Sequence, residues 1–159
     1  MMNIKNLKPS KKSFYKQGYY EINEKAKYVG PLPVIYRSSW EKKFCIYLDK
    51  HPDVLLWSSE PFKIPYYNIL DKKIHHYYPD FYAKIKKDDI IVQYIIEVKP
   101  LAQLTKPIKP KNNNRKAWVN YKRCMTTYII NLCKKDALEK FAKGRGYKTL
   151  FVTEKTSFI

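Results

Sequence analysis

The chain has few cysteines and no long hydrophobic run, and these two absences exclude several protein classes. Its three cysteines, Cys45, Cys124 and Cys133, are widely spaced and odd in number, so they fit neither a zinc-binding spacing nor a disulfide framework. We expect buried free thiols in a reducing compartment. No apolar stretch is long enough for a transmembrane helix, and residues 1–5 lack the apolar segment of a signal peptide. No membrane partner is therefore predicted.

Acidic residues are also scarce. The 159 residues include 32 Lys and Arg but only 14 Asp and Glu, which gives a net charge of +18. Such an excess favours a polyanionic partner, most simply nucleic acid, although a ribosome-associated or membrane-surface protein would also have it. The length predicts one domain, at residues 36–159, preceded by a basic and tyrosine-rich arm at residues 1–35. The arm either becomes ordered on DNA or a protein partner, or drapes over the surface.

Residues 78–100 carry the clearest pattern in the sequence. Apolar side chains recur at every second position on both sides of a polar segment, as in strands with one buried face. The acidic pair Asp88-Asp89 at the middle is typical of a turn. We therefore predict a β-hairpin in which Phe81 pairs with Ile96, because this register turns the apolar side chains of both strands toward the same core.

The same register brings two carboxylates and a lysine together. Asp80 lies opposite Glu97, at a Cβ separation of about 4.5–5.5 Å, and Lys99 points from the same face as Glu97. Opposed carboxylates repel each other unless one is protonated or a cation lies between them, and a divalent ion such as Mg²⁺ suits hard oxygen ligands. A surface hairpin with a Glu–Lys pair is the plainer interpretation, but it leaves the opposed acids unexplained.

A third acid lies in the first predicted helix. Ser38 and Glu41 fit an S-x-x-E capping box, and an apolar stripe continues from there to about Lys50. Glu41 belongs to the buried side of this helix, near its N-terminus. It can serve as a capping residue alone, or it can also be aimed at the hairpin, and both interpretations stay open on physical grounds.

The remaining segments predict a mixed α/β domain with helices on a central, mostly antiparallel sheet. Short strands are expected from residue 54 and over residues 62–67, and a last strand over 147–153. Three prolines and three lysines predict a non-helical loop at 100–114. A long helix should begin at Arg115 and reach about Cys133, and residues 134–143 either extend it or form a second helix.

Pro79-Asp80 followed by Glu97-Val98-Lys99 resembles the signature of the PD-(D/E)XK nuclease superfamily, and the order of elements is similar to its restriction-endonuclease-like core. A wider set of segments resembles the TnsA-like endonuclease branch and the head-completion proteins of T-even-type phages. These segments are residues 36–41, 57–60, 64–66, 78–81 and 96–100.

The resemblance implies a metal-dependent DNA nuclease with Glu41, Asp80, Glu97 and Lys99 as its catalytic residues. Asp80, Glu97 and the backbone carbonyl of Val98 would bind Mg²⁺, which Mn²⁺ could replace, and Glu41 is a further candidate ligand. Lys99 would position the attacking water and stabilise negative charge in the transition state. TnsA-like enzymes carry Gln at the position of Glu97, so the present chain has the acid where they do not.

Basic residues around this signature are candidates for contacts with DNA phosphates, which position a duplex without reading its sequence. No base-reading constellation is recognisable, so we expect low sequence specificity or cleavage directed by DNA structure or ends. The candidate phosphate contacts are Arg37, Lys106, Lys109, Lys111, Arg115 and Lys122.

The leading hypothesis is an Mg²⁺-dependent endonuclease that hydrolyses packaged double-stranded DNA during phage head completion. It would act in the host cytoplasm during assembly and in the virion head or neck, with portal or neck proteins as partners. Two alternatives share the fold. One is a non-catalytic neck or plug protein that binds DNA and the portal, and the other is a resolvase or repair nuclease for branched DNA.

Overall fold

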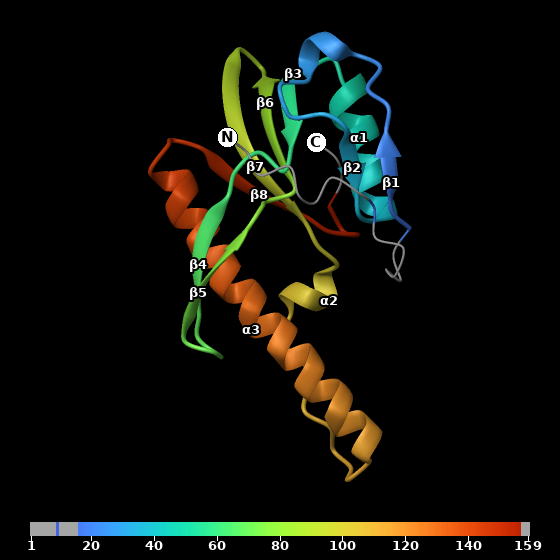
Figure 1. Cartoon of the computed structure of the whole chain (residues 1–159), viewed down its shortest axis with the longest axis vertical. Helices are drawn as coiled ribbons and strands as arrows, with labels where there is room; N and C mark the ends of the chain where they lie inside the picture. The colour runs from blue at the N-terminus through green and yellow to red at the C-terminus, as the bar shows by residue number, and fades with distance from the viewer. Residues whose placement is uncertain (1–8, 10–15, 157–159) are drawn as a thin grey trace.

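The computed structural model describes residue 9 and residues 16–156, and these form a central sheet with a helix against each face (Figure 1). The expected mixed α/β class is confirmed. In chain order the elements are β1 (Gly18–Tyr20), a 3-10 turn (Lys25–Lys27), β2 (Val34–Tyr36), α1 (Ser39–Lys50), β3 (Val54–Ser59), β4 (Ile64–Asn68), β5 (Lys73–Tyr77), β6 (Phe81–Lys87), β7 (Ile90–Val98), α2 (Leu101–Leu104), α3 (Arg115–Lys143) and β8 (Lys148–Val152).

The central sheet has the strand order β3-β6-β7-β8. β3, β6 and β7 are antiparallel neighbours, and β8 lies parallel to β7. A parallel neighbour requires a crossover connection, and α3 provides it between β7 and β8. The sheet is therefore mixed and mostly antiparallel, as the sequence predicts.

The β6–β7 hairpin has the predicted register. Phe81 pairs with Ile96, and the pairing continues down to Lys87 and Ile90. The two residues left between the strands are Asp88 and Asp89, and Asp88 has a φ of 54°, as tight hairpin turns require. The alternation of apolar and polar residues was thus sufficient to define this hairpin.

Helices cover both faces of the sheet, whereas the hairpin pattern alone predicts only one buried face. On one side Phe81 and Ile96 pack with Phe44 and Leu48 of α1. On the other side Ile95, which is fully buried, packs with Leu138 and its neighbours on α3. Buried side chains therefore follow one another without alternation at the end of β7, from Ile95 to Val98. Glu97 lies within this run.

β4 and β5 form a separate two-stranded ribbon rather than a further part of the central sheet. Alternate residues of β4 are buried, and among them Ile64 and Tyr66 pack against α3. The ribbon therefore extends the layer that covers α3 (Figure 1), and it leads the chain back to the start of β6.

The segment after β7 differs in part from the prediction of a non-helical loop. Residues 101–104 form the short helix α2, because Pro100 can precede a helix and the remaining prolines lie beyond Thr105. α3 is one continuous helix of 29 residues, so residues 134–143 extend it. Asn114 caps it by accepting hydrogen bonds from the N–H groups of the first turn. The first half of α3 projects away from the sheet (Figure 1).

The predicted arm lies in part outside the described residues. From Gly18 onward the chain is folded, since β1 pairs with β2, and Val34 and Ile35 of β2 are buried. A domain boundary at residue 36 stays a prediction. All three cysteines are free thiols, and Cys45 alone is fully buried. Among the described helices, none is both long and apolar enough to cross a bilayer.

Candidate active site

Glu41 both caps α1 and lines a pocket. The Ser38 hydroxyl accepts a hydrogen bond from the Glu41 N–H (3.1 Å) and donates one to Glu41 Oε1 (3.0 Å). The Arg37 N–H donates to Glu41 Oε2 (2.7 Å). The Ser38 half of the predicted capping box is therefore present, while the Glu41 carboxylate reaches back to the N–H of Arg37, one residue before the cap. The same side chain lines a cavity of about 450 Å³ together with Asp80 and Lys99, so the two interpretations left open by the sequence are compatible.

Asp80 stands at the start of β6, next to the last residue pair of the hairpin ladder. Its carboxylate oxygen Oδ2 accepts a hydrogen bond from the N–H of Val98 (2.7 Å), which ties it to the end of β7. Its carbonyl accepts the N–H of Glu60 (3.0 Å). The peptide preceding β6 is thus fixed from two sides, and this holds the acid beside Glu97 and Lys99.

Glu97 and Lys99 form an ion pair below the pocket. Lys99 Nζ lies 2.9 Å from Glu97 Oε1, and the Glu97 side chain is only 7% exposed. The second oxygen of this carboxylate, Oε2, is buried and has no hydrogen-bond partner among the described residues. An unpaired buried carboxylate oxygen is costly, so the chemistry of this oxygen fits a cation ligand.

The electrostatics of the three acids reflect burial and crowding. Burial and the charge of Asp80 raise the pKa of Glu41 to about 7, and the same two causes raise the pKa of Glu97 to about 7. Burial also raises the pKa of Asp80. Burial would lower the pKa of Lys99, but the charges of Asp80 and Glu97 outweigh it and raise that pKa. Lys99 is therefore held as a cation.

This arrangement suits a divalent cation by its chemistry. The acids offer hard carboxylate oxygens, which Mg²⁺ prefers, and their raised pKa values mark negative charge that lacks sufficient positive partners. Within the described part of the chain, however, no three His, Cys, Asp or Glu side chains converge closely enough to hold a metal ion. Glu97 Oε2 is the oxygen with no competing partner. The assignment of ligands stays a prediction.

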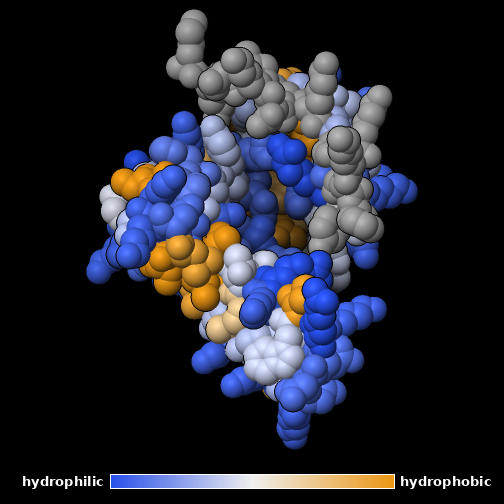
Figure 2. Space-filling view, turned by 60° about the horizontal axis from the view of Figure 1, so that its bottom comes forward, coloured by the Kyte–Doolittle hydropathy of each residue, from blue (hydrophilic) through white to orange (hydrophobic). Residues whose placement is uncertain are grey.

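The six predicted DNA contacts fall into two groups. Arg37 lines the pocket itself, where its guanidinium Nε pairs with Glu60 at 2.8 Å. The other five lie on the loop after α2 and on the first half of α3, which is the projecting end of the molecule. Figure 2 brings this end forward and shows it mostly hydrophilic. These five are Lys106, Lys109, Lys111, Arg115 and Lys122.

Sequence reasoning missed a second lysine beside the acids. Lys134 of α3 lines a small cavity with Glu97 and Lys99. Its ammonium lies 5.4 Å from the ring centre of Tyr77 and 5.7 Å from that of Tyr66. Burial and the repulsion of Lys99 lower the pKa of Lys134. Its position in the helix could have identified it, because a lysine four residues before the buried Leu138 lies on the apolar face of the helix.

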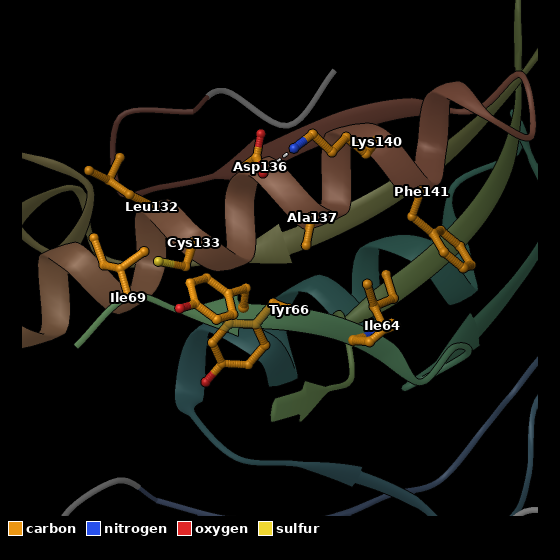
Figure 3. A pocket seen from close by; sticks show the side chains of 11 residues that line it. Ile64, Tyr66, Ile69, Leu132, Cys133, Asp136, Ala137, Lys140 and Phe141 are labelled. Carbon is orange, nitrogen blue, oxygen red and sulfur yellow. Dashed lines mark hydrogen bonds and ion pairs between the residues drawn. The ribbon is translucent and has the colours of Figure 1, made fainter. Parts of the chain in front are cut away.

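A cavity larger than the acidic pocket lies elsewhere, between the β4–β5 ribbon and α3 (Figure 3). It measures about 770 Å³ and is lined largely by apolar and aromatic side chains such as Ile64, Tyr66 and Phe141. Its charged residues, Asp136 and Lys140, pair with each other at 2.7 Å. No acid cluster faces it, so this cavity is not a candidate for the chemistry.

Comparison with known proteins shows the family to which the chain is similar. The family described as "TnsA-like endonuclease N terminal" matches residues 51–154, a range that contains Asp80, Glu97 and Lys99 but not Glu41. The chain is also 34% identical over 130 residues to the head completion nuclease of Enterobacteria phage T4, and the match covers 81% of this chain and 85% of that protein. No solved structure gives a significant match.

Proposed function

The chain belongs to the TnsA-like endonuclease N-terminal family and is by homology a nuclease, and from this premise we propose that it is a metal-dependent DNA endonuclease of phage head completion. One observation carries the proposal. Glu41, Asp80 and Lys99 line a single pocket, and Glu97 forms an ion pair with Lys99. Similarity to a phage head completion nuclease supports the biological setting.

The residues of the pocket divide into ligands and cations. Asp80, Glu97 and the backbone carbonyl of Val98 would hold Mg²⁺ or Mn²⁺, with Glu41 as a further candidate ligand. When bound, the metal ion would polarise the scissile phosphate and lower the pKa of a coordinated water. The buried Glu97 Oε2, which has no partner among the described residues, is the atom best suited to such a ligand role.

Lys99 supplies positive charge at the reacting phosphate. Its pKa is raised by Asp80 and Glu97, although burial opposes the shift, so it stays protonated and acts as a cation rather than as a base. Hydrolysis adds negative charge to the phosphate oxygens in the transition state, and a fixed ammonium stabilises that charge. Lys134 places a second ammonium on the far side of Glu97, where it offsets the charge of the buried acid.

The basic residues would hold the duplex outside this pocket. Contacts from Lys106, Lys109 and Lys111 on the loop, and from Arg115 and Lys122 on α3, would fall on phosphates and would not read bases. Cleavage would therefore have low sequence specificity. The net charge of +18 supports such a sequence-independent grip.

The proposal is tested by incubating plasmid DNA with the purified protein and Mg²⁺ or Mn²⁺. We expect the native protein to cut, EDTA to stop the cutting, and Asp80→Ala and Lys99→Ala each to lower the rate at least about 100-fold. The matched controls are Asp136→Ala and Lys140→Ala, which remove an exposed acid–lysine pair from α3. These two variants should cut like the native protein.

The result also separates the alternative functions. DNA binding without any cutting, under every metal condition, would favour a non-catalytic neck or plug protein that binds DNA and the portal. Cutting confined to branched substrates would favour a resolvase or repair nuclease. Cutting of unbranched DNA, linear or supercoiled, is the result that fits an enzyme acting on packaged DNA in the host cytoplasm or in the virion head and neck.

A further inference from the structure

We propose that Trp40 and Lys43 form a subsite for an unpaired nucleobase beside the acidic pocket, so that the preferred substrate is DNA with a single-stranded end. The inference rests on the proposed nuclease function and specifies the substrate of the same site. It starts from the position of Trp40, which lines the pocket next to Glu41 and is 39% exposed.

Trp40 differs from the other two tryptophans of the chain. Trp57 is fully buried in the core. Trp118 donates its indole N–H to the carbonyl of Asn112 (3.0 Å) and packs edge-on against Tyr121. Trp40 instead presents a large aromatic surface at the mouth of a polar cavity, where it contributes little to the core. A large apolar side chain at a functional cavity is a candidate ligand contact.

Lys43 places a positive charge beside this aromatic surface. Its Nζ lies 5.5 Å from the centre of the Trp40 ring, within the range of a cation–π interaction. An aromatic platform accompanied by a cation fits a nucleotide, since the ring stacks on the base and the cation meets the phosphate next to it. The two residues belong to the first turns of α1, so the fold fixes their spacing.

The opposite wall of the cavity is made by the end of β7 and by α2. Pro100 adds apolar surface there, as does Val152 at the end of the neighbouring strand β8, and Gln103 adds an amide that can hydrogen-bond to a base edge. Glu154 lies on the same rim, where its Oε2 accepts the N–H of Leu101 (2.9 Å). A nucleotide between Trp40 and Gln103 would therefore lie directly beside the pocket that contains Glu41 and Asp80.

The flat face of a base is accessible only when the base is unpaired. In a duplex the bases cover one another, and a protein reaches only their edges and the backbone. An aromatic ring that stacks on a base must therefore act on a single strand, or on a nucleotide turned out of the helix. The position of Trp40 beside the acids places such a nucleotide next to the scissile phosphate.

Binding tests the subsite without any cleavage. The probes are a fluorescein-labelled single-stranded oligonucleotide of mixed sequence and the blunt duplex of the same sequence, both in EDTA. We expect Trp40→Ala to weaken binding of the single strand at least about 5-fold, as the loss of one stacked base predicts. Trp40→Phe should retain most of the affinity. Tyr67→Ala, which removes an even more exposed aromatic residue from the β4–β5 ribbon, should match the native protein.

Cleavage then tests the substrate preference. The native protein should cut a duplex with a single-stranded overhang faster than a blunt duplex. Trp40→Ala should reduce cutting of the overhang substrate at least about 5-fold more than cutting of the blunt one. Equal losses on both substrates, or no loss on either, would overturn the inference. A native protein that cuts no DNA would refute the proposed function instead, and the binding experiment would still decide the role of Trp40.

Discussion

A single buried carboxylate, Asp49 of α1, fastens the segment that precedes β2 to the rest of the molecule. Its oxygens accept hydrogen bonds from the Tyr20 hydroxyl (2.8 Å), from the backbone and side-chain N–H groups of Asn23 (2.8 and 3.0 Å) and from the Glu24 N–H (3.1 Å). Burial would raise the pKa of Asp49, but these donors outweigh it and hold the pKa below its ordinary value. The carboxylate is therefore charged and saturated with donors.

Replacing Asp49 should destabilise the fold in a pH-dependent way. We expect Asp49→Asn to lower the free energy of unfolding by about 2–3 kcal/mol at pH 7, because amide N–H groups cannot accept the same hydrogen bonds. A folded pKa below the unfolded value stabilises the protein above that value and loses its effect as the pH falls through the folded pKa. The difference between native and variant protein should thus shrink as the pH falls below the ordinary pKa of an aspartate.

Urea denaturation at a series of pH values measures this difference. Asp136→Asn is the control, because it changes an acid that is 65% exposed and paired only with Lys140. Its effect should stay within about 0.5 kcal/mol, as is usual for surface ion pairs. If Asp49→Asn lowers the free energy of unfolding equally at pH 3 and pH 7, the charge of Asp49 does not contribute to stability.

At the scale of elements, the turn between α3 and β8 contains two glycines with different backbone conformations. Gly146 has a φ of 69°, in the left-handed region, whereas Gly144 has a helical φ of −63°. A Cβ on Gly144 would meet only backbone oxygens at 3.6 Å or more, and a Cβ on Gly146 would meet nothing within 4 Å. Any penalty at Gly146 is therefore one of backbone conformation and not of space.

The two glycines form a matched pair for mutagenesis. We expect Gly146→Ala to destabilise the protein by about 1–2 kcal/mol, because a side chain disfavours the left-handed conformation. Gly144→Ala should be neutral or should stabilise by up to about 1 kcal/mol, since alanine restricts the unfolded chain and favours a helix. Thermal or urea unfolding of both variants measures the effect. Equal destabilisation by the two would contradict the assigned turn geometry.

The elements differ in how far the sequence could predict them. The β6–β7 register followed from side-chain alternation and from the turn at Asp88, and the start of α1 followed from Ser38 and Glu41, because these signals are local. The separation of β4 and β5 from the sheet could not be predicted, since it depends on packing against α3. The same holds for Asp49, whose hydrogen-bond partners lie far away in the sequence.

At the scale of the whole molecule, the acids and most of the predicted DNA contacts lie apart. The acidic residues gather at the end of the sheet between α1 and α3, while the lysines of the α2–α3 loop accompany the projecting half of α3 (Figure 1). In Figure 2 the projecting end is predominantly hydrophilic. A duplex bound by the positive end would therefore contact the acidic pocket at a second position along its length.

The salt dependence of DNA binding tests this division. We expect replacement of Lys106, Lys109 and Lys111 by Gln to weaken binding to all sequences and to reduce the slope of log K against log salt by up to about three. The control replaces three lysines of the distant strand β6, Lys84, Lys86 and Lys87, with the same loss of charge. If both triple variants change the slope equally, only the net charge matters and not its location.

α3 also acts as a fixed spacer. It is continuous from Arg115 at its first turn to Lys134 beside Glu97. At a rise of 1.5 Å per residue, these two positions are about 28 Å apart along the helix axis. This length corresponds to about eight base pairs of duplex DNA at 3.4 Å each. A duplex that runs along α3 and contacts both Arg115 and Lys134 must therefore extend about eight base pairs from the cut. A duplex that is shorter on this side of the cut would lose the contacts with the first turns of α3.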